Sequence, residues 1–223
     1  EYEAIQKSKH WKSFDSRRHL YKVENLQNFR NNKLSVGLDD KYSKEEQREI
    51  YQDLVKDLGE EYVHSNLGEV NVGNSKEYFN IGKLFVDAGQ NIHIKWLHEL
   101  EKYVFSKKEI NYVCEIGGGY GSFAQKIRSK FKCKYILIDL PEANLLSSYY
   151  LSKHFPDLKF LLCDEIEGRG VSKAQIDEYD FVIIPPWYEI EDDIRIDLFI
   201  NTRSMMEMNF KVIDPDIVKS RHP

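Results

Sequence analysis

The sequence has few cysteines, no excess of basic residues and no long apolar run, and each absence excludes a class of protein. The three cysteines among 223 residues are Cys114, Cys133 and Cys163, and none forms a C-x-x-C pair. We therefore expect buried thiols in a reducing compartment, not a disulfide framework. No run of eighteen apolar residues and no basic-then-apolar leader is present. These absences predict a cytoplasmic protein without a membrane span.

Charge and ligand spacing exclude two further classes. The 32 basic residues are outnumbered by 37 acidic ones, and the net charge is −5. Such a balance gives no general attraction to a polyanion, so we expect no nucleic-acid partner. No His, Asp and Glu cluster has the spacing of a metal site, and we expect no metal.

Residues 1–108 are polar and typical of helices, and we interpret them as a helical N-terminal region acting as a cap, a lid or a homo-oligomer contact. Ser43 and Glu46 have the spacing of a capping box, and Gly59 can end the helix that follows. Residues 63–82 are rich in Gly and Asn, which predicts an irregular loop. A second helix is predicted over residues 84–105.

Residues 109–223 alternate short apolar runs with helical patterns, which is typical of βαβ units. The predicted strands are 112–115, 135–139, 160–164 and 180–184, and the predicted helices are 123–131 and 144–155. The fold class expected is α/β, with a Rossmann-like, doubly wound parallel sheet. No further strand is predicted before Pro223, so the C-terminal strands of such a sheet are missing from the pattern.

A glycine-rich segment follows the first predicted strand and precedes a helix. It reads Glu115-Ile-Gly-Gly-Gly-Tyr-Gly121, with Gly117, Gly119 and Gly121 spaced as GxGxG. Glycines here permit a tight turn and close approach of backbone amides to a ligand. A dinucleotide fingerprint would place glycine where Ser122 stands. The Glu115 carboxylate would repel a pyrophosphate but attract a sulfonium or ammonium group.

Two further strands end in acids. Asp139, followed by Leu140, can accept hydrogen bonds from both hydroxyls of a ribose. Asp164, followed by Glu165, can accept an adenine amino group, or it can be a helix cap or an exposed turn acid. Ligands of parallel sheets bind beyond the carboxyl ends of the strands, so these acids and the glycine loop are expected in one site.

Together these residues resemble the first three cofactor motifs of class I methyltransferases that use S-adenosylmethionine. Three segments more narrowly resemble the sugar O-methyltransferase family: Cys-Glu-Ile-Gly-Gly-Gly-Tyr-Gly-Ser122, Ile138-Asp-Leu-Pro-Glu142 with Tyr149-Tyr-Leu151, and Asn201-Thr-Arg-Ser-Met-Met-Glu-Met208. The resemblance implies that Glu115 holds the amino group of the cofactor. It also implies that Gly117, Gly118, Gly119, Tyr120 and Gly121 wrap the methionine portion, and that S-adenosylhomocysteine is the product. The implied acceptor is a sugar or glycan, such as a nucleotide sugar or a surface polysaccharide precursor.

The fourth predicted strand ends in Ile184-Pro-Pro-Trp-Tyr188, which resembles the (N/D)-P-P-(Y/F/W) signature of amino-methyltransferases. Ile184 occupies the position of the accepting Asn or Asp, which leaves N-methylation as an alternative only. Pro185 is expected beside the cofactor. Trp187 and Tyr188 can stack on a sugar ring or pack beside a sulfonium.

The candidates for a catalytic base are Glu189 and His154, with Asp164 and Glu207 also considered. Glu189 can equally be a solvated acid, and His154 can be a residue at a helix end. Asn201, Arg203 and Glu207 are candidates for substrate contacts on a helix whose methionines can alternatively be core. Two other functions stay open: a nicotinamide-dependent oxidoreductase, and a methyltransferase fold that binds a partner without catalysis.

Overall fold

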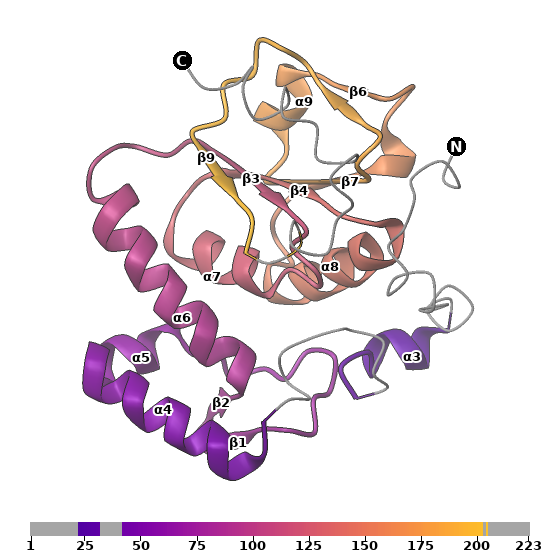
Figure 1. Cartoon of the computed structure of the whole chain (residues 1–223). Coiled ribbons are helices and arrows are strands. Elements are labelled where there is room, and N and C mark those ends of the chain that lie inside the picture. The colour runs from indigo at the N-terminus through magenta and orange to yellow at the C-terminus, as the bar shows by residue number, and fades with distance from the viewer. Residues whose placement is uncertain (1–21, 32–41, 203, 205–223) are drawn as a thin grey trace.

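The computed structural model describes residues 22–31, 42–202 and 204, and its centre is a five-stranded, all-parallel sheet (Figure 1). The order of the strands across the sheet is β5-β7-β4-β3-β9. Their bounds are β3 (Tyr112–Ile116), β4 (Lys134–Ile138), β5 (Phe160–Leu162), β7 (Phe181–Ile184) and β9 (Leu198–Ile200). This is an α/β fold compatible with the Rossmann-like arrangement that the alternating pattern predicts.

Both faces of the sheet are covered, which explains why its strands are apolar throughout. Tyr135 and Leu137 of β4 pack on one face with α7 (Ser122–Lys130) and α8 (Pro141–His154). Ile136 points to the other face and packs in a second cluster that includes Ile176 of α9 (Lys173–Glu178). Smaller elements flank that face: the 3₁₀ turn η4 (Cys163–Glu165), and the parallel pair β6 (Gly170–Val171) and β8 (Glu189–Ile190). The sheet is therefore a buried layer between two cores.

The four predicted strands are confirmed, with shifts of one or two residues at their ends. A fifth strand, β9, was missed because Leu198–Ile200 is only three residues long and lies close to residues interpreted as a helix. It pairs with β3 in parallel, and the Asp197 carboxylate accepts hydrogen bonds from the Asn111 and Tyr112 amides at 2.8 and 3.0 Å. Thus at least one strand follows the four that the pattern predicts.

The N-terminal region is helical as predicted, but it also contains a hairpin. Its elements are α3 (Val23–Gln27), α4 (Lys44–Leu58), α5 (Glu60–Asn66), β1 (Phe79–Ile81), β2 (Leu84–Val86), α6 (Ala88–Leu100) and the π-helical turn η3 (Glu101–Phe105). The Ser43 capping box and the end of α4 at Gly59 are confirmed. Among the described residues, every helix lacks the length or the apolar character to cross a membrane.

Two N-terminal predictions are corrected. The helix predicted from residue 84 begins at Ala88, because the Asp87 side chain caps it by accepting from the Gln90 amide at 2.7 Å. Leu84–Val86 instead pairs with Phe79–Ile81 as the antiparallel hairpin β1–β2. The irregular loop predicted over residues 63–82 is shorter than expected, because residues 63–66 belong to α5 and residues 79–81 belong to β1.

The turn after α3 packs closely against the loop that contains Gly73. The Arg30 amide donates to the Gly73 carbonyl at 3.0 Å, and the Asn74 amide group donates to Asn28 Oδ1 at 2.6 Å. Phe29 is fully buried in the core beside α7 and α8. Gly73 has φ of +86°, and a Cβ there would lie 2.5 Å from the Phe29 ring. Only glycine allows this approach without displacing the aromatic ring.

We predict that Gly73→Ala destabilises the protein by about 2–4 kcal/mol, because left-handed strain adds to a collision with a buried ring. Gly59→Ala is the matched control: its φ is +85° and its Cβ would meet nothing within 4 Å. The control carries backbone strain alone, on the order of 1–3 kcal/mol for this φ and ψ, and it should lose less than Gly73→Ala. Urea denaturation measures the free energy of unfolding of both variants. Equal losses of stability would contradict the close contact between Gly73 and the Phe29 ring.

Candidate functional site

Four segments meet at the carboxyl edge of the sheet: residues 117–121 after β3, 139–140 after β4, 185–188 after β7, and residues 201, 202 and 204 after β9. β3 has β4, the next strand in sequence, on one side and β9, the last described strand, on the other. The order in which strands are added therefore switches sides at β3: β4 lies on one side of it and β9 on the other, and all three strands are parallel. Ligands of open α/β sheets bind at such a switch point. The glycine loop lies there, as the sequence predicts.

The conformation of the loop requires its glycines. Gly117, Gly119 and Gly121 have φ of +75°, +59° and +86°, in the left-handed region that other residues rarely adopt. A side chain at Gly117 would also collide with Ser204. Gly121 is the N-cap of α7, and among the described residues no side chain caps that end. Backbone amides of the first turn of a helix can then serve a ligand.

Glu115 lies directly beneath the loop. Its side chain is only 1% exposed, and it accepts a hydrogen bond from the Tyr135 hydroxyl at 2.8 Å. A Cβ on Gly118 would be 3.0 Å from the Glu115 carboxyl carbon, so the loop backbone covers this group. Burial raises the pKa of Glu115 to about 7; the hydrogen bond from Tyr135 opposes the shift and nearby Asp139 adds to it. The predicted carboxylate is therefore next to the loop, but enclosed.

Asp139 connects the ends of the two central strands. Its carboxylate accepts from the Gly119 amide at 2.8 Å and from the Leu140 amide at 2.7 Å. Burial raises the pKa of Asp139 to about 6, although both amide hydrogen bonds lower it. The sequence placed Asp139 at this edge, and the structure adds its direct bond to the glycine loop.

The residues after β9 close over the start of the loop. Asn201 Nδ2 donates to the Ile116 carbonyl at 2.8 Å, and Ser204 Oγ donates to the same oxygen at 2.9 Å. Asn201 Nδ2 also lies 2.6 Å from Ser204 Oγ. Asn201, a predicted substrate contact, thus holds the backbone of the loop. Two other predicted contacts, Arg203 and Glu207, lie outside the described residues.

The acids after β5 are not beside Asp139, because β7 lies between β5 and β4. Asp164 and Glu165 are exposed in the turn η4, and the Glu165 carboxylate accepts from the Leu162 amide at 3.0 Å. The edge position next to Asp139 belongs instead to buried Pro185. The order of the strands along the sequence does not show that β7 lies between β4 and β5, so the sequence predicted Asp164 in the place that Pro185 occupies.

Two aromatic residues, Trp187 and Tyr188, follow β7 at this edge of the sheet. Tyr188 turns toward β5, where its hydroxyl donates to the Cys163 carbonyl at 2.9 Å. Trp187 is half-buried beside it. Glu189 begins β8 and is exposed, and its backbone amide donates to the Arg169 carbonyl at 2.8 Å. The Tyr188 hydroxyl is therefore already engaged by the protein.

The two candidate bases are on opposite faces of the sheet. His154 ends α8, its ring lies 4.5 Å from that of Tyr150, and burial lowers its pKa to about 4. Ile190, next to Glu189, packs in the cluster on the other face. The structure therefore does not bring Glu189 and His154 together.

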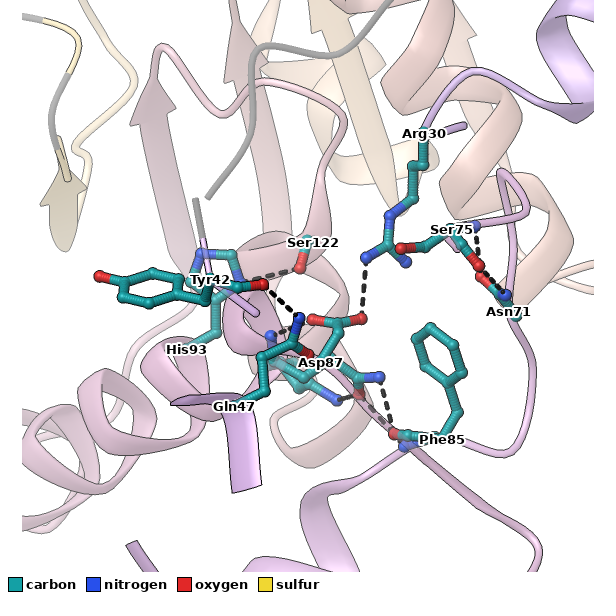
Figure 2. Close-up of polar contacts among 12 residues, drawn as sticks. Arg30, Tyr42, Gln47, Asn71, Ser75, Phe85, Asp87, His93 and Ser122 are labelled. Atoms are coloured by element: carbon teal, nitrogen blue, oxygen red, sulfur yellow. Dashed lines mark hydrogen bonds and ion pairs between the residues drawn. The ribbon is translucent and has the colours of Figure 1, made fainter. Parts of the chain in front are cut away.

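A buried polar network, which the sequence did not indicate, joins the N-terminal region to α7 (Figure 2). Asp87 is fully buried and pairs with Arg30 at 2.8 Å. Lys126 Nζ donates to Gln90 Oε1 at 2.7 Å, and burial lowers its pKa to about 8. Nearby, His93 Nδ1 lies 2.8 Å from the hydroxyl of Ser122, the first residue of α7. Burial lowers the pKa of His93 to about 3, so this ring is neutral at physiological pH.

We predict that, as pH rises from 5 to 8, the wild type loses stability relative to Glu115→Gln, because the variant lacks the contribution of this carboxyl group while both proteins share those of His93 and His154. The folded pKa of Glu115, about 7, lies above the unfolded value near 4.5, so the folded state binds the extra proton within that window. The expected effect is on the order of 2 kcal/mol, and Gln keeps an acceptor for Tyr135. Urea titrations at both pH values measure it. An unchanged slope in Glu115→Gln would contradict the assignment.

Comparisons with known proteins give no assignment: no family model, no curated protein and no solved structure matches the chain. In the part of the chain that the structure describes, no group of three or more His, Cys, Asp and Glu side chains is arranged to hold a metal ion. Any functional conclusion therefore depends on the edge of the sheet around the glycine loop.

Proposed function

We propose that this protein is a methyltransferase that uses S-adenosylmethionine. The observation that carries the proposal is the Asp139–Gly119 hydrogen bond at the carboxyl edge of the sheet, with buried Glu115 directly beneath the same loop. The resemblance of residues 115–121 to a class I cofactor motif supports it. Asp139 would hold the ribose, and the loop backbone would surround the methionine portion.

The electrostatics of the loop favour a cationic ligand over a pyrophosphate. Glu115 and Asp139 both have raised pKa values, and each gains from a nearby positive charge that stabilises its ionised form. A dinucleotide would bring two more negative charges to the same loop. Ser122 is also buried and bonded to His93, where the dinucleotide pattern has a glycine. Nicotinamide-dependent oxidation is therefore the weaker proposal.

The proposed acceptor is the hydroxyl of a sugar or glycan, by resemblance to the sugar O-methyltransferase family. The sulfonium supplies an already activated methyl group, so the protein must mainly align the acceptor oxygen with it. Half-buried Trp187 follows β7 at this edge and can offer a ring to a sugar. N-methylation lacks support, because fully buried Ile184 cannot accept a hydrogen bond from an amine.

A non-catalytic binding protein with the same fold is the second candidate. The observation that favours it is the separation of Glu189 and His154 onto opposite faces of the sheet. Intact cofactor binding without methyl transfer to any member of a carbohydrate panel would support this candidate over an enzyme.

We predict that S-adenosylhomocysteine binds the protein and that Asp139→Asn weakens binding at least tenfold, a loss of about 1.4 kcal/mol. The matched control is Asp180→Asn, whose carboxylate accepts from the Lys159 amide and Arg128 near the amino ends of β5 and β7. That control should lose stability but keep its affinity within twofold. Calorimetry measures both variants. Binding of NADH in place of S-adenosylhomocysteine would sink the proposal.

We also predict that S-adenosylhomocysteine binds about tenfold more tightly at pH 8 than at pH 6. Its ammonium group favours the ionised form of Glu115, whose pKa of about 7 leaves only a minority ionised at pH 6. Binding below pH 7 should release a proton, seen as a heat that depends on the ionisation enthalpy of the buffer. Glu115→Gln should remove most of this dependence, and a pH-independent affinity in the wild type would contradict the role of Glu115.

A further inference from the structure

We propose that Arg30 is a positioning residue for the glycine loop and that residues 22–31 form part of the cofactor site. This inference rests on the proposed function. The Arg30 guanidinium carbon lies 5.6 Å from the centre of the Phe85 ring and 5.4 Å from that of the Tyr120 ring. Arg30 therefore contacts both the hairpin, through Phe85 of β2, and the glycine loop, through Tyr120.

The position of the guanidinium is fixed from a third direction. Arg30 Nη2 donates to Asp87 Oδ2 at 2.8 Å, and both side chains are at most 3% exposed (Figure 2). A planar guanidinium can stack on aromatic rings while it keeps a charged hydrogen bond in its own plane. Because Asp87 is the N-cap of α6, this contact aligns Arg30 with the helix that packs against α7.

Tyr120 is also held by other rings of the same assembly. Phe29, adjacent to Arg30, has its ring centre 5.4 Å from that of Tyr120, and the Tyr150 ring of α8 is 5.1 Å away with edge-to-face geometry. The residue of the loop with the largest side chain is thus packed between the N-terminal segment and α8. Any movement of Tyr120 must change its contacts with Phe29 and Arg30.

A linkage follows from these contacts. A ligand that orders the glycine loop must also favour docking of residues 22–31, and docking must in turn raise affinity for the ligand by the same factor. Residues 22–31 also form hydrogen bonds with Gly73 and Asn74, which lie outside the glycine loop. Their docking can therefore be observed separately from binding of the cofactor. Arg30 is the residue that makes the contact with Tyr120 and the contact with Asp87 at once.

The experiment compares Arg30→Lys with Arg128→Lys in the complete chain. Lysine keeps a charge for Asp87 but loses the planar guanidinium that contacts the Phe85 and Tyr120 rings. We expect Arg30→Lys to weaken S-adenosylhomocysteine binding five- to tenfold in calorimetry. Arg128 is the matched control, since it pairs with Asp180 at 2.8 Å near the other end of α7, and its variant should bind within twofold of the wild type.

Amide hydrogen exchange gives a readout that a purely structural role would not change. S-adenosylhomocysteine should slow exchange in residues 22–31 of the wild type and of Arg128→Lys, and this slowing should shrink at least threefold in Arg30→Lys. Should Arg30→Lys not fold, Phe85→Leu removes the second ring that the guanidinium contacts and is expected to give the same two effects.

The outcomes separate the two proposals. Binding by the wild type without slower exchange in residues 22–31, or equal affinities of wild type and Arg30→Lys, would overturn the role of Arg30 and leave the cofactor assignment standing. No binding of S-adenosylhomocysteine by the wild type would overturn the proposed function and this inference with it.

Discussion

The buried carboxylate of Asp87 is the constraint on which the assembly of the two halves of the chain depends. A fully buried charge is costly unless it is paired and hydrogen-bonded. Burial alone would raise the pKa of Asp87, but the Arg30 guanidinium, the Gln90 amide and the Lys126 ammonium hold it below its ordinary value. These three partners come from the segment after α3, from α6 and from α7. The charge is therefore stabilised only when all three segments are packed together.

The two carboxyl groups at the edge of the sheet, buried Glu115 and half-buried Asp139, are in a different environment. Glu115 and Asp139 receive hydrogen bonds from a tyrosine and from backbone amides, and within residues 22–31, 42–202 and 204 no cation is among the groups that shift their pKa values. Their pKa values are raised, whereas that of Asp87 is lowered. Asp87 is thus satisfied within the fold, while Glu115 and Asp139 would gain from a positive ligand. This contrast distinguishes a structural carboxylate from candidates for a binding site.

The sequence predicted those features that depend on neighbours in the chain. The Ser43 capping box, the βαβ alternation and the glycines of residues 117–121 are local patterns, and the structure contains them. Features set by distant pairing were missed: Asp87 and Arg30 are 57 residues apart, and the position of β7 between β4 and β5 is decided by sheet pairing. Leu84–Val86 was assigned to a helix because a short apolar run fits either period.

The contacts of α7 show why the N-terminal region is not simply an appended unit. The first residue of that helix, Ser122, is buried and bonded to His93 of α6, and one turn later Lys126 donates to the Asn66 carbonyl at 2.6 Å. A glycine loop alone has little conformational preference. Its geometry is fixed at one end by β3 and at the other by α7, and the start of α7 is held by α5 and α6. The N-terminal helices therefore determine the shape of the loop as directly as the sheet does.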